Sequence, residues 1–118
     1  MSLQRIALFG GSFDPVHCGH ILVARAAVEE LSADMLYFVC AKQNPLKADG
    51  PHANDADRLE MLRLAAAHDE RFLVSDVEMQ RGGPSYTIDT VREFKTKMPL
   101  AEFYWLVGAD ALHELPFW

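Results

Sequence analysis

The fold is decided by the stretch Gly10-Gly11-Ser12-Phe13-Asp14-Pro15-Val16-His17-Cys18-Gly19-His20. It follows the apolar run 5–9, which has the length of a strand, and precedes 21–31, where apolar residues recur at helical spacing. We therefore predict a strand, a glycine turn and the first turn of a helix. Unpaired backbone N–H groups and the helix dipole make such a turn suitable for a phosphate. Because residues three apart are neighbours on a helix, His17 and His20 are expected to face that phosphate together.

Apolar runs and helical patterns alternate along the rest of the chain. This alternation predicts an α/β fold, a doubly wound parallel sheet with helices on both faces. The third apolar run is the least apolar, so we place it at a sheet edge. The expected strands are 6–9, 35–40, 72–77 and 103–107. The expected helices are 21–31, from Asn54 or Asp55 to about His68, from a cap at Ser85 to Pro99, and 111–115.

Three of these helices carry an apolar stripe at the spacing of one helix face. We expect these stripes to face the sheet and to supply much of the core. Their residues are Ile21, Ala24, Val28 and Leu31 in the first helix, Leu59, Leu62 and Ala66 in the second, and Ile88, Val91, Phe94 and Met98 in the third.

The composition restricts the class of protein. The chain has 118 residues, enough for one domain, and a formal net charge of −6, which argues against general nucleic-acid binding. Its two cysteines form no disulfide framework, which suits a reducing compartment. The sequence shows neither an apolar run long enough to cross a membrane nor the pattern of a signal peptide. We expect a cytoplasmic protein whose anionic ligand is held by local groups.

The side chains near the turn do not form a set for covalent catalysis. Ser12 lacks the flanking pattern of a nucleophile elbow, and Cys18 has no evident base, so we interpret Cys18 as a spacer. One alternative is that the two histidines form half of a zinc site, but no further ligands lie at the spacing of such a site. The other alternative is a plain pair of surface histidines. Transfer of a phosphoryl or nucleotidyl group between bound anions needs no protein nucleophile. Lys42 and Lys47, in a loop after the second strand, suit the same chemistry.

Four stretches together resemble a known family. Residues 11–20, Gly-Ser-Phe-Asp-Pro-Val-His-Cys-Gly-His, resemble the signature of the nucleotidyltransferase α/β-phosphodiesterase superfamily, whose His-x-Gly-His box begins the first helix. Residues 81–90, containing Pro-Ser-Tyr-Thr, resemble bacterial nicotinate-nucleotide adenylyltransferases in particular. So do the loop Asn-Pro-Leu-Lys at 44–47 and the segment 105–118, with its Gly-Ala-Asp and its last tryptophan.

The resemblance implies a reaction and a set of residues. Adenylyl transfer from ATP to nicotinate mononucleotide would give deamido-NAD and pyrophosphate, with Mg²⁺ accompanying ATP and no metal site on the protein. The catalytic residues would be His17 and His20, which would stabilise developing charge. The implied ATP contacts are Gly10, Gly11, Ser12, Phe13, His17, His20, Gly108 and Asp110. The implied nicotinate-nucleotide contacts are Asn44, Lys47, Ser85, Tyr86, Thr87, Leu112 and Trp118.

Several alternatives stay open at this point. The chain is also compatible with another adenylyl or cytidylyl transferase, such as the phosphopantetheine enzyme, or with an inactive nucleotide-binding fragment. The structural alternatives are a core role for Trp118, a helix cap for Asp110, and a cap of their own helix for Ser85 with Thr87. Cys40-Ala41 stands where many family members have a Pro-Asn pair, so that contact is absent or replaced.

The resemblance also implies that part of the family pattern is missing. The superfamily sheet is Rossmann-like with strand order 3-2-1-4-5, and a later Ser/Thr–Arg segment binds the ATP phosphates. Because no such segment precedes Trp118, we expect residues 1–118 to be a nucleotidyltransferase domain without strand five and the C-terminal part. Strand 103–107 would then be an open apolar edge, which favours pairing with another chain. We expect self-association, as a homo-oligomer, or poor folding.

Overall fold

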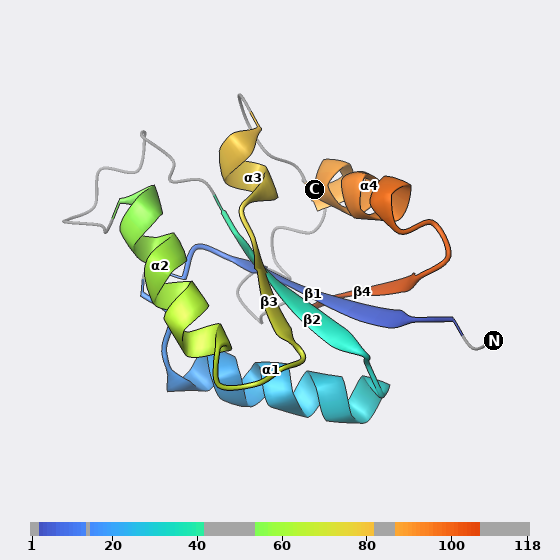
Figure 1. Cartoon of the computed structure of the whole chain (residues 1–118), viewed down its shortest axis with the longest axis horizontal. Coiled ribbons are helices and arrows are strands. Elements are labelled where there is room, and N and C mark those ends of the chain that lie inside the picture. The colour runs from blue at the N-terminus through green and yellow to red at the C-terminus, as the bar shows by residue number, and fades with distance from the viewer. Residues whose placement is uncertain (1–2, 14, 42–53, 82–86, 107–118) are drawn as a thin grey trace, which may run out of the picture.

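The computed structural model describes residues 3–13, 15–41, 54–81 and 87–106. Within these ranges strands and helices alternate, except that two helices follow the third strand (Figure 1). The elements are β1 (Arg5–Gly11), α1 (Cys18–Leu31), β2 (Met35–Cys40), α2 (Asp55–Ala66), β3 (Phe72–Ser75), α3 (Val77–Gln80), α4 (Thr87–Lys97) and β4 (Glu102–Leu106).

The strands form one parallel sheet in the order β3-β2-β1-β4. Ile6 of β1 stands opposite Met35 of β2 and Phe103 of β4. Every crossover between paired strands passes through a helix, as parallel pairing requires. The predicted α/β fold and the order of its first four strands are confirmed, and so is the edge position of β3. Self-association through β4, at the other edge of the described sheet, stays a prediction.

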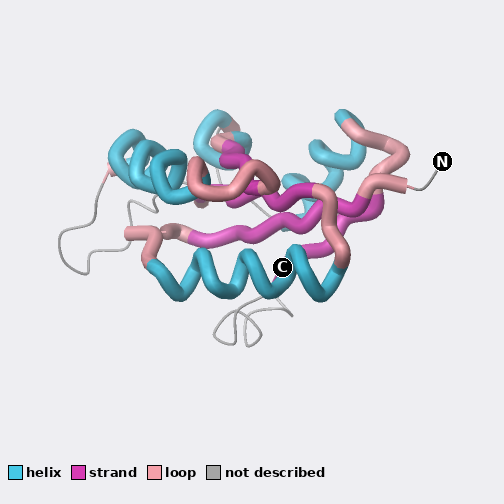
Figure 2. The backbone as a smooth tube through the Cα atoms, turned by 60° about the horizontal axis from the view of Figure 1, so that its bottom comes forward, coloured by secondary structure: helices cyan, strands magenta, loops and turns pink. Residues whose placement is uncertain are grey.

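Two cores lie on the two faces of the sheet, between the layers of helices seen in Figures 1 and 2. Successive residues of β1 alternate between the faces, so Ala7 joins one core and Ile6 and Leu8 join the other. All three side chains are fully buried, which explains why this strand is apolar throughout. Helices α1 and α2 cover the first core, and α3 and α4 cover the second.

The predicted helix faces agree with the structure in α1 and α2. Ala24 and Val28 of α1 are buried, and so are Leu62 and Ala66 of α2. Asn54 caps α2 as predicted, since its side-chain oxygen accepts a hydrogen bond from the Asp57 N–H at 2.8 Å. Helix α2 ends at Ala66, slightly before the predicted end at His68.

The prediction for α4 is wrong at Ile88, which is 52% exposed. Thr90 is fully buried instead, beside Phe94 in the inward stripe. The Thr90 hydroxyl donates to Glu78 Oε2 of α3 at 2.8 Å and accepts from Arg81 Nη1 at 3.2 Å. Because its polar atom is satisfied, a threonine can occupy the position where apolar spacing predicted a core residue.

The third strand is shorter than predicted. It ends at Ser75 rather than Val77, and Val77 begins the short helix α3. The Ser75 hydroxyl oxygen accepts a hydrogen bond from the Val77 N–H at 3.3 Å, so a local side-chain bond competes with continued pairing. Val77 is nevertheless buried, in the core under α4. In the described part of the chain, no helix has the length and apolar character needed to cross a membrane.

One pH-dependent contribution to stability is expected at Asp69, after α2. The side chain and backbone of Arg71 donate hydrogen bonds to its carboxylate at 2.8–3.0 Å, which lowers the pKa of Asp69 to about 2. A lowered folded-state pKa stabilises the fold above the unfolded-state value near 3.8, and this contribution is lost as the pH falls to about 2. Asp69→Asn should therefore be less stable than the native chain in urea unfolding at neutral pH, and this difference should shrink as the pH falls through about 2.

The exposed neighbour Glu70 provides a control for this prediction. Glu70→Gln should leave both the stability and its pH profile close to native. A difference between Asp69→Asn and the native chain that stays constant across the acid range would show that the Arg71 contact does not act through this ionisation.

Candidate active site

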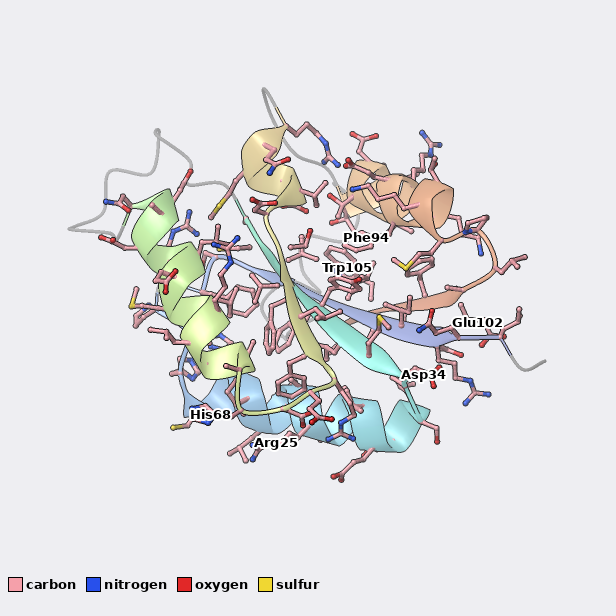
Figure 3. All side chains as sticks on the ribbon, in the orientation of Figure 1. Arg25, Asp34, His68, Phe94, Glu102 and Trp105 are labelled. Carbon is pink, nitrogen blue, oxygen red and sulfur yellow. The ribbon has the colours of Figure 1, made fainter. Side chains whose placement is uncertain are left out.

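The turn after β1 lies at the carboxyl end of the sheet, where open α/β folds bind ligands. The predicted glycine turn needs a correction, because Gly10 and Gly11 continue β1 and pair with Val39 and Cys40. Gly10 is required for packing: a Cβ there would meet Trp105 Cζ2 at 2.5 Å. Figure 3 shows Trp105 near Phe94, and both belong to the core under α4.

The unusual backbone conformation of this turn falls on Phe13, which has a φ of 46°. A bulky residue seldom adopts a positive φ unless its surroundings hold it there. The Phe13 ring is buried and packs against three neighbours, with centroids 5.5 Å from Phe9, 5.6 Å from Phe38 and 5.0 Å from His20. Burial in the core under α1 therefore fixes both the turn and one side of His20.

His17 and His20 form a capping box at the start of α1. His17 is the N-cap residue, and its Nδ1 accepts a hydrogen bond from the Gly19 N–H at 3.0 Å. The His17 N–H donates to His20 Nδ1, also at 3.0 Å. The two rings stack with centroids 3.8 Å apart, so the predicted proximity of the two histidines is confirmed.

The capping box fixes which ring nitrogens face a ligand. Because both Nδ1 atoms accept hydrogen bonds, a neutral imidazole at either position carries its proton on Nε2. Burial, and secondarily the nearby His17, lowers the pKa of His20, which keeps that ring neutral at physiological pH. The start of α1 therefore offers two Nε2–H donors beside the N-terminal amides of the helix, an arrangement suited to phosphate oxygens.

Gly19 accommodates the His17 ring. In the structure a Cβ at this position would lie 2.9 Å from His17 Cε1. Helix propensity alone favours alanine over glycine by about 1 kcal/mol. We expect Gly19→Ala to displace the His17 ring and lose its cap bond, which costs about 1 kcal/mol. Urea unfolding should thus show no net stabilisation, and calorimetry should show weaker binding of ATP, the nucleotide expected from the sequence.

The exposed Ala26, later in α1, is the matched control for this substitution. Ala26→Gly reports the propensity difference alone and should cost about 1 kcal/mol without altering ATP binding. A Gly19→Ala variant stabilised by that same amount, with native ATP affinity, would contradict the proposed contact between Gly19 and the His17 ring.

The structure locates only some of the predicted site residues. Gly10, Gly11, Ser12 and Phe13 lead directly into the two histidines, so these six lie together at one end of the sheet. Thr87 is the first residue of α4, a helix on the opposite face of the sheet from α1. The remaining predicted contacts lie outside the described residues: Asn44, Lys47, Ser85, Tyr86, Gly108, Asp110, Leu112 and Trp118.

Within the described ranges, no cluster of three or more histidine, cysteine, aspartate or glutamate side chains is arranged to hold a metal ion. The groups described at the start of α1 are N–H donors, whereas Mg²⁺ prefers oxygen ligands. The described part of the site therefore does not fit a protein-held Mg²⁺. Cys18 is an exposed free thiol, and Cys40 is a buried one.

Arg58 is a buried residue at this site that the sequence analysis missed. Its side chain extends from α2, and its Nη1 donates to the Ser12 carbonyl oxygen at 2.6 Å and to the Ala41 carbonyl oxygen at 2.9 Å. The signal was present, because Arg58 precedes Leu62 and Ala66 at intervals of four in the buried stripe of α2. An arginine in an apolar helix face indicates that buried acceptors lie opposite it.

The chain is similar to known nucleotidyltransferases in sequence. Residues 8–118 match the family described as cytidylyltransferase-like. A probable nicotinate-nucleotide adenylyltransferase from Opitutus terrae is 48% identical over 115 residues, covering 98% of this chain and 59% of that protein. Its counterpart from a Synechococcus strain is 43% identical over 118 residues, covering all of this chain and 58% of the relative. The chain thus spans less than two thirds of the length of these curated relatives.

Solved structures share the fold at low sequence identity. Plasmodium falciparum nicotinic acid mononucleotide adenylyltransferase, complexed with NaAD, superposes with a TM-score of 0.77 at 20% identity, covering 94% of this chain and 55% of that one. The same enzyme complexed with APC gives a TM-score of 0.79 at 19% identity, covering 98% and 56%. These likenesses confirm the predicted Rossmann-like architecture.

Proposed function

Because the chain belongs to the cytidylyltransferase-like family, we propose that it carries the nucleotidyltransferase domain of a nicotinate-nucleotide adenylyltransferase, within residues 1–118. The observation that carries the proposal is the pair of stacked imidazoles whose Nδ1 atoms are both occupied, which leaves two Nε2–H donors at the start of α1. Relatives that are 43–48% identical and bear this enzyme name support the choice of reaction.

The proposed reaction needs no protein nucleophile. A phosphate oxygen of nicotinate mononucleotide attacks the α-phosphorus of ATP and forms a new P–O bond. The bond between that phosphorus and the oxygen bridging to the β-phosphate breaks, and its electron pair leaves with pyrophosphate. Negative charge shifts onto the phosphate oxygens during this transfer, so fixed N–H donors accelerate the reaction by positioning and charge stabilisation. His17 and His20 are the catalytic residues of this proposal.

The other predicted contacts are part of the proposal. The backbone of Gly10, Gly11, Ser12 and Phe13 would line the ATP phosphate region, together with Gly108 and Asp110. The nicotinate nucleotide would be held by Asn44, Lys47, Ser85, Tyr86, Thr87, Leu112 and Trp118. Mg²⁺ would arrive on the phosphate oxygens of ATP, and no step described here depends on it. Two free thiols suit a reducing compartment, so we place the protein in the cytoplasm.

Pyrophosphate release with three acceptors tests the proposed function. Nicotinate mononucleotide should support release and phosphopantetheine should not, and the comparison with nicotinamide mononucleotide measures the preference between the two pyridine nucleotides. Calorimetry should show ATP binding to the same protein. Release with phosphopantetheine would assign the chain to the other transferase. ATP binding without release on any acceptor would indicate an inactive nucleotide-binding module.

A further inference from the structure

We propose that Arg58 is a positioning residue, which holds the Ser12–Phe13 peptide so that the Phe13 N–H faces the phosphate of the nucleotide. The inference rests on the proposed function, since that function puts a phosphate at the start of α1. It adds a residue of α2 to a site that the motif alone confines to β1, its turn and α1.

Arg58 joins three segments that are distant in the sequence. Its Nη1 bonds to Ser12 in the turn and to Ala41 directly after β2, and it lies 3.7 Å from Cys40 Sγ. Its Nη2 forms a salt bridge with Asp55 in the first turn of α2. The side chain is 1% exposed, so water does not compete for these bonds. The turn is therefore tied to the sheet and to α2 through one guanidinium.

The hydrogen bond to Ser12 determines the direction of the next amide. In a trans peptide the C=O and the following N–H point to opposite sides of the chain. Because the Ser12 C=O points toward the buried guanidinium, the Phe13 N–H points away from it. The φ of Phe13 sets the angle between this peptide plane and the Phe13 side chain, and the buried ring holds that φ at its positive value. One backbone donor is thus set in place before any anion binds.

The choice of an arginine is not explained by stability alone. Burying a cation costs free energy, and a well-packed apolar side chain in place of a buried ion pair is often neutral or stabilising. Arg58 Nε has no hydrogen-bond partner within the described structure, which adds to that cost. An apolar residue in this stripe could not donate hydrogen bonds to the two carbonyl oxygens that Nη1 holds.

The test combines a spectroscopic measurement with substitutions. In the native protein, adding inorganic pyrophosphate should shift the Phe13 amide resonance in ¹H–¹⁵N spectra along with those at the start of α1. Arg58→Met should bind pyrophosphate and ATP about tenfold more weakly by calorimetry, at a temperature where circular dichroism shows it folded. Arg58→Lys, which keeps the charge and can reach one carbonyl, should recover part of the affinity. Arg63→Met, an exposed arginine of the same helix, should bind as the native protein does.

The outcomes separate this inference from the proposed function. Native protein that binds neither ATP nor pyrophosphate would overturn both. Native binding with an unmoved Phe13 amide would overturn only the role of Arg58, and this result needs no variant to fold. Folded Arg58→Met with native affinity would do the same, because a purely structural residue changes stability and leaves the affinity of the folded protein unchanged.

Discussion

Replacing His20 with alanine is expected to lower the turnover of the proposed adenylyl transfer by about 10²–10³-fold, the usual effect of removing one donor to developing charge. The native ring suits that role, since its Nδ1 accepts from the His17 N–H and its Nε2–H therefore stays available as a donor. Release of pyrophosphate from ATP and nicotinate mononucleotide in the intact protein provides the measurement. Turnover near the native value would remove His20 from the mechanism.

Stability must be measured beside turnover, because His20 also supports the fold locally. Its ring packs against Phe9 and Phe13, with centroids 6.0 and 5.0 Å away, and its Nδ1 completes the capping box. His20→Ala should therefore lose about 1 kcal/mol of unfolding free energy. His20→Gln is the matched control: a glutamine at this helix position can accept from the N-cap N–H, yet it lacks the outward imidazole donor. It should regain stability but not turnover.

The sheet was predictable from the sequence because burial dominates it. Parallel strands covered on both faces must be apolar at consecutive positions, and β1 and β2 are. The helix faces that cover the sheet are apolar for the same reason, and the burial of Val28 and Leu62 was therefore predicted correctly. The proximity of His17 and His20 was predictable as well, since spacing along a helix fixes it.

The failures occur where tertiary contacts override local preference. A glycine pair favours a turn, yet packing against Trp105 keeps Gly10 in β1, and burial moves the positive φ to Phe13. Hydrogen bonds from across the fold make Thr90 a core residue and place Arg58 inside an apolar stripe. Each of these depends on tertiary partners: the periodicity of α2 places Arg58 in the buried stripe, but it does not identify the acceptors that Arg58 binds.

Removing the Phe13 ring should have the largest effect on stability at this site. Phe13→Ala deletes a buried aromatic side chain, which typically costs about 3–5 kcal/mol, a large part of the roughly 5–15 kcal/mol that stabilises a domain. The left-handed backbone of the turn would lose the packing that holds it, and His20 would lose its neighbour at 5.0 Å. Urea unfolding should show the destabilisation, and calorimetry should show about tenfold weaker ATP binding by the folded variant.

Phe72→Ala separates the local effect of Phe13 from the general cost of a cavity. Phe72 of β3 is buried in the same core and packs against Phe38, whose ring also contacts Phe13. Its removal should cost a similar free energy of unfolding, since the same volume is lost, while ATP affinity stays close to native. Equal losses of affinity in both variants would mean that softening the core as a whole weakens the site. A loss confined to Phe13→Ala would show that the ring acts on His20 and the turn directly.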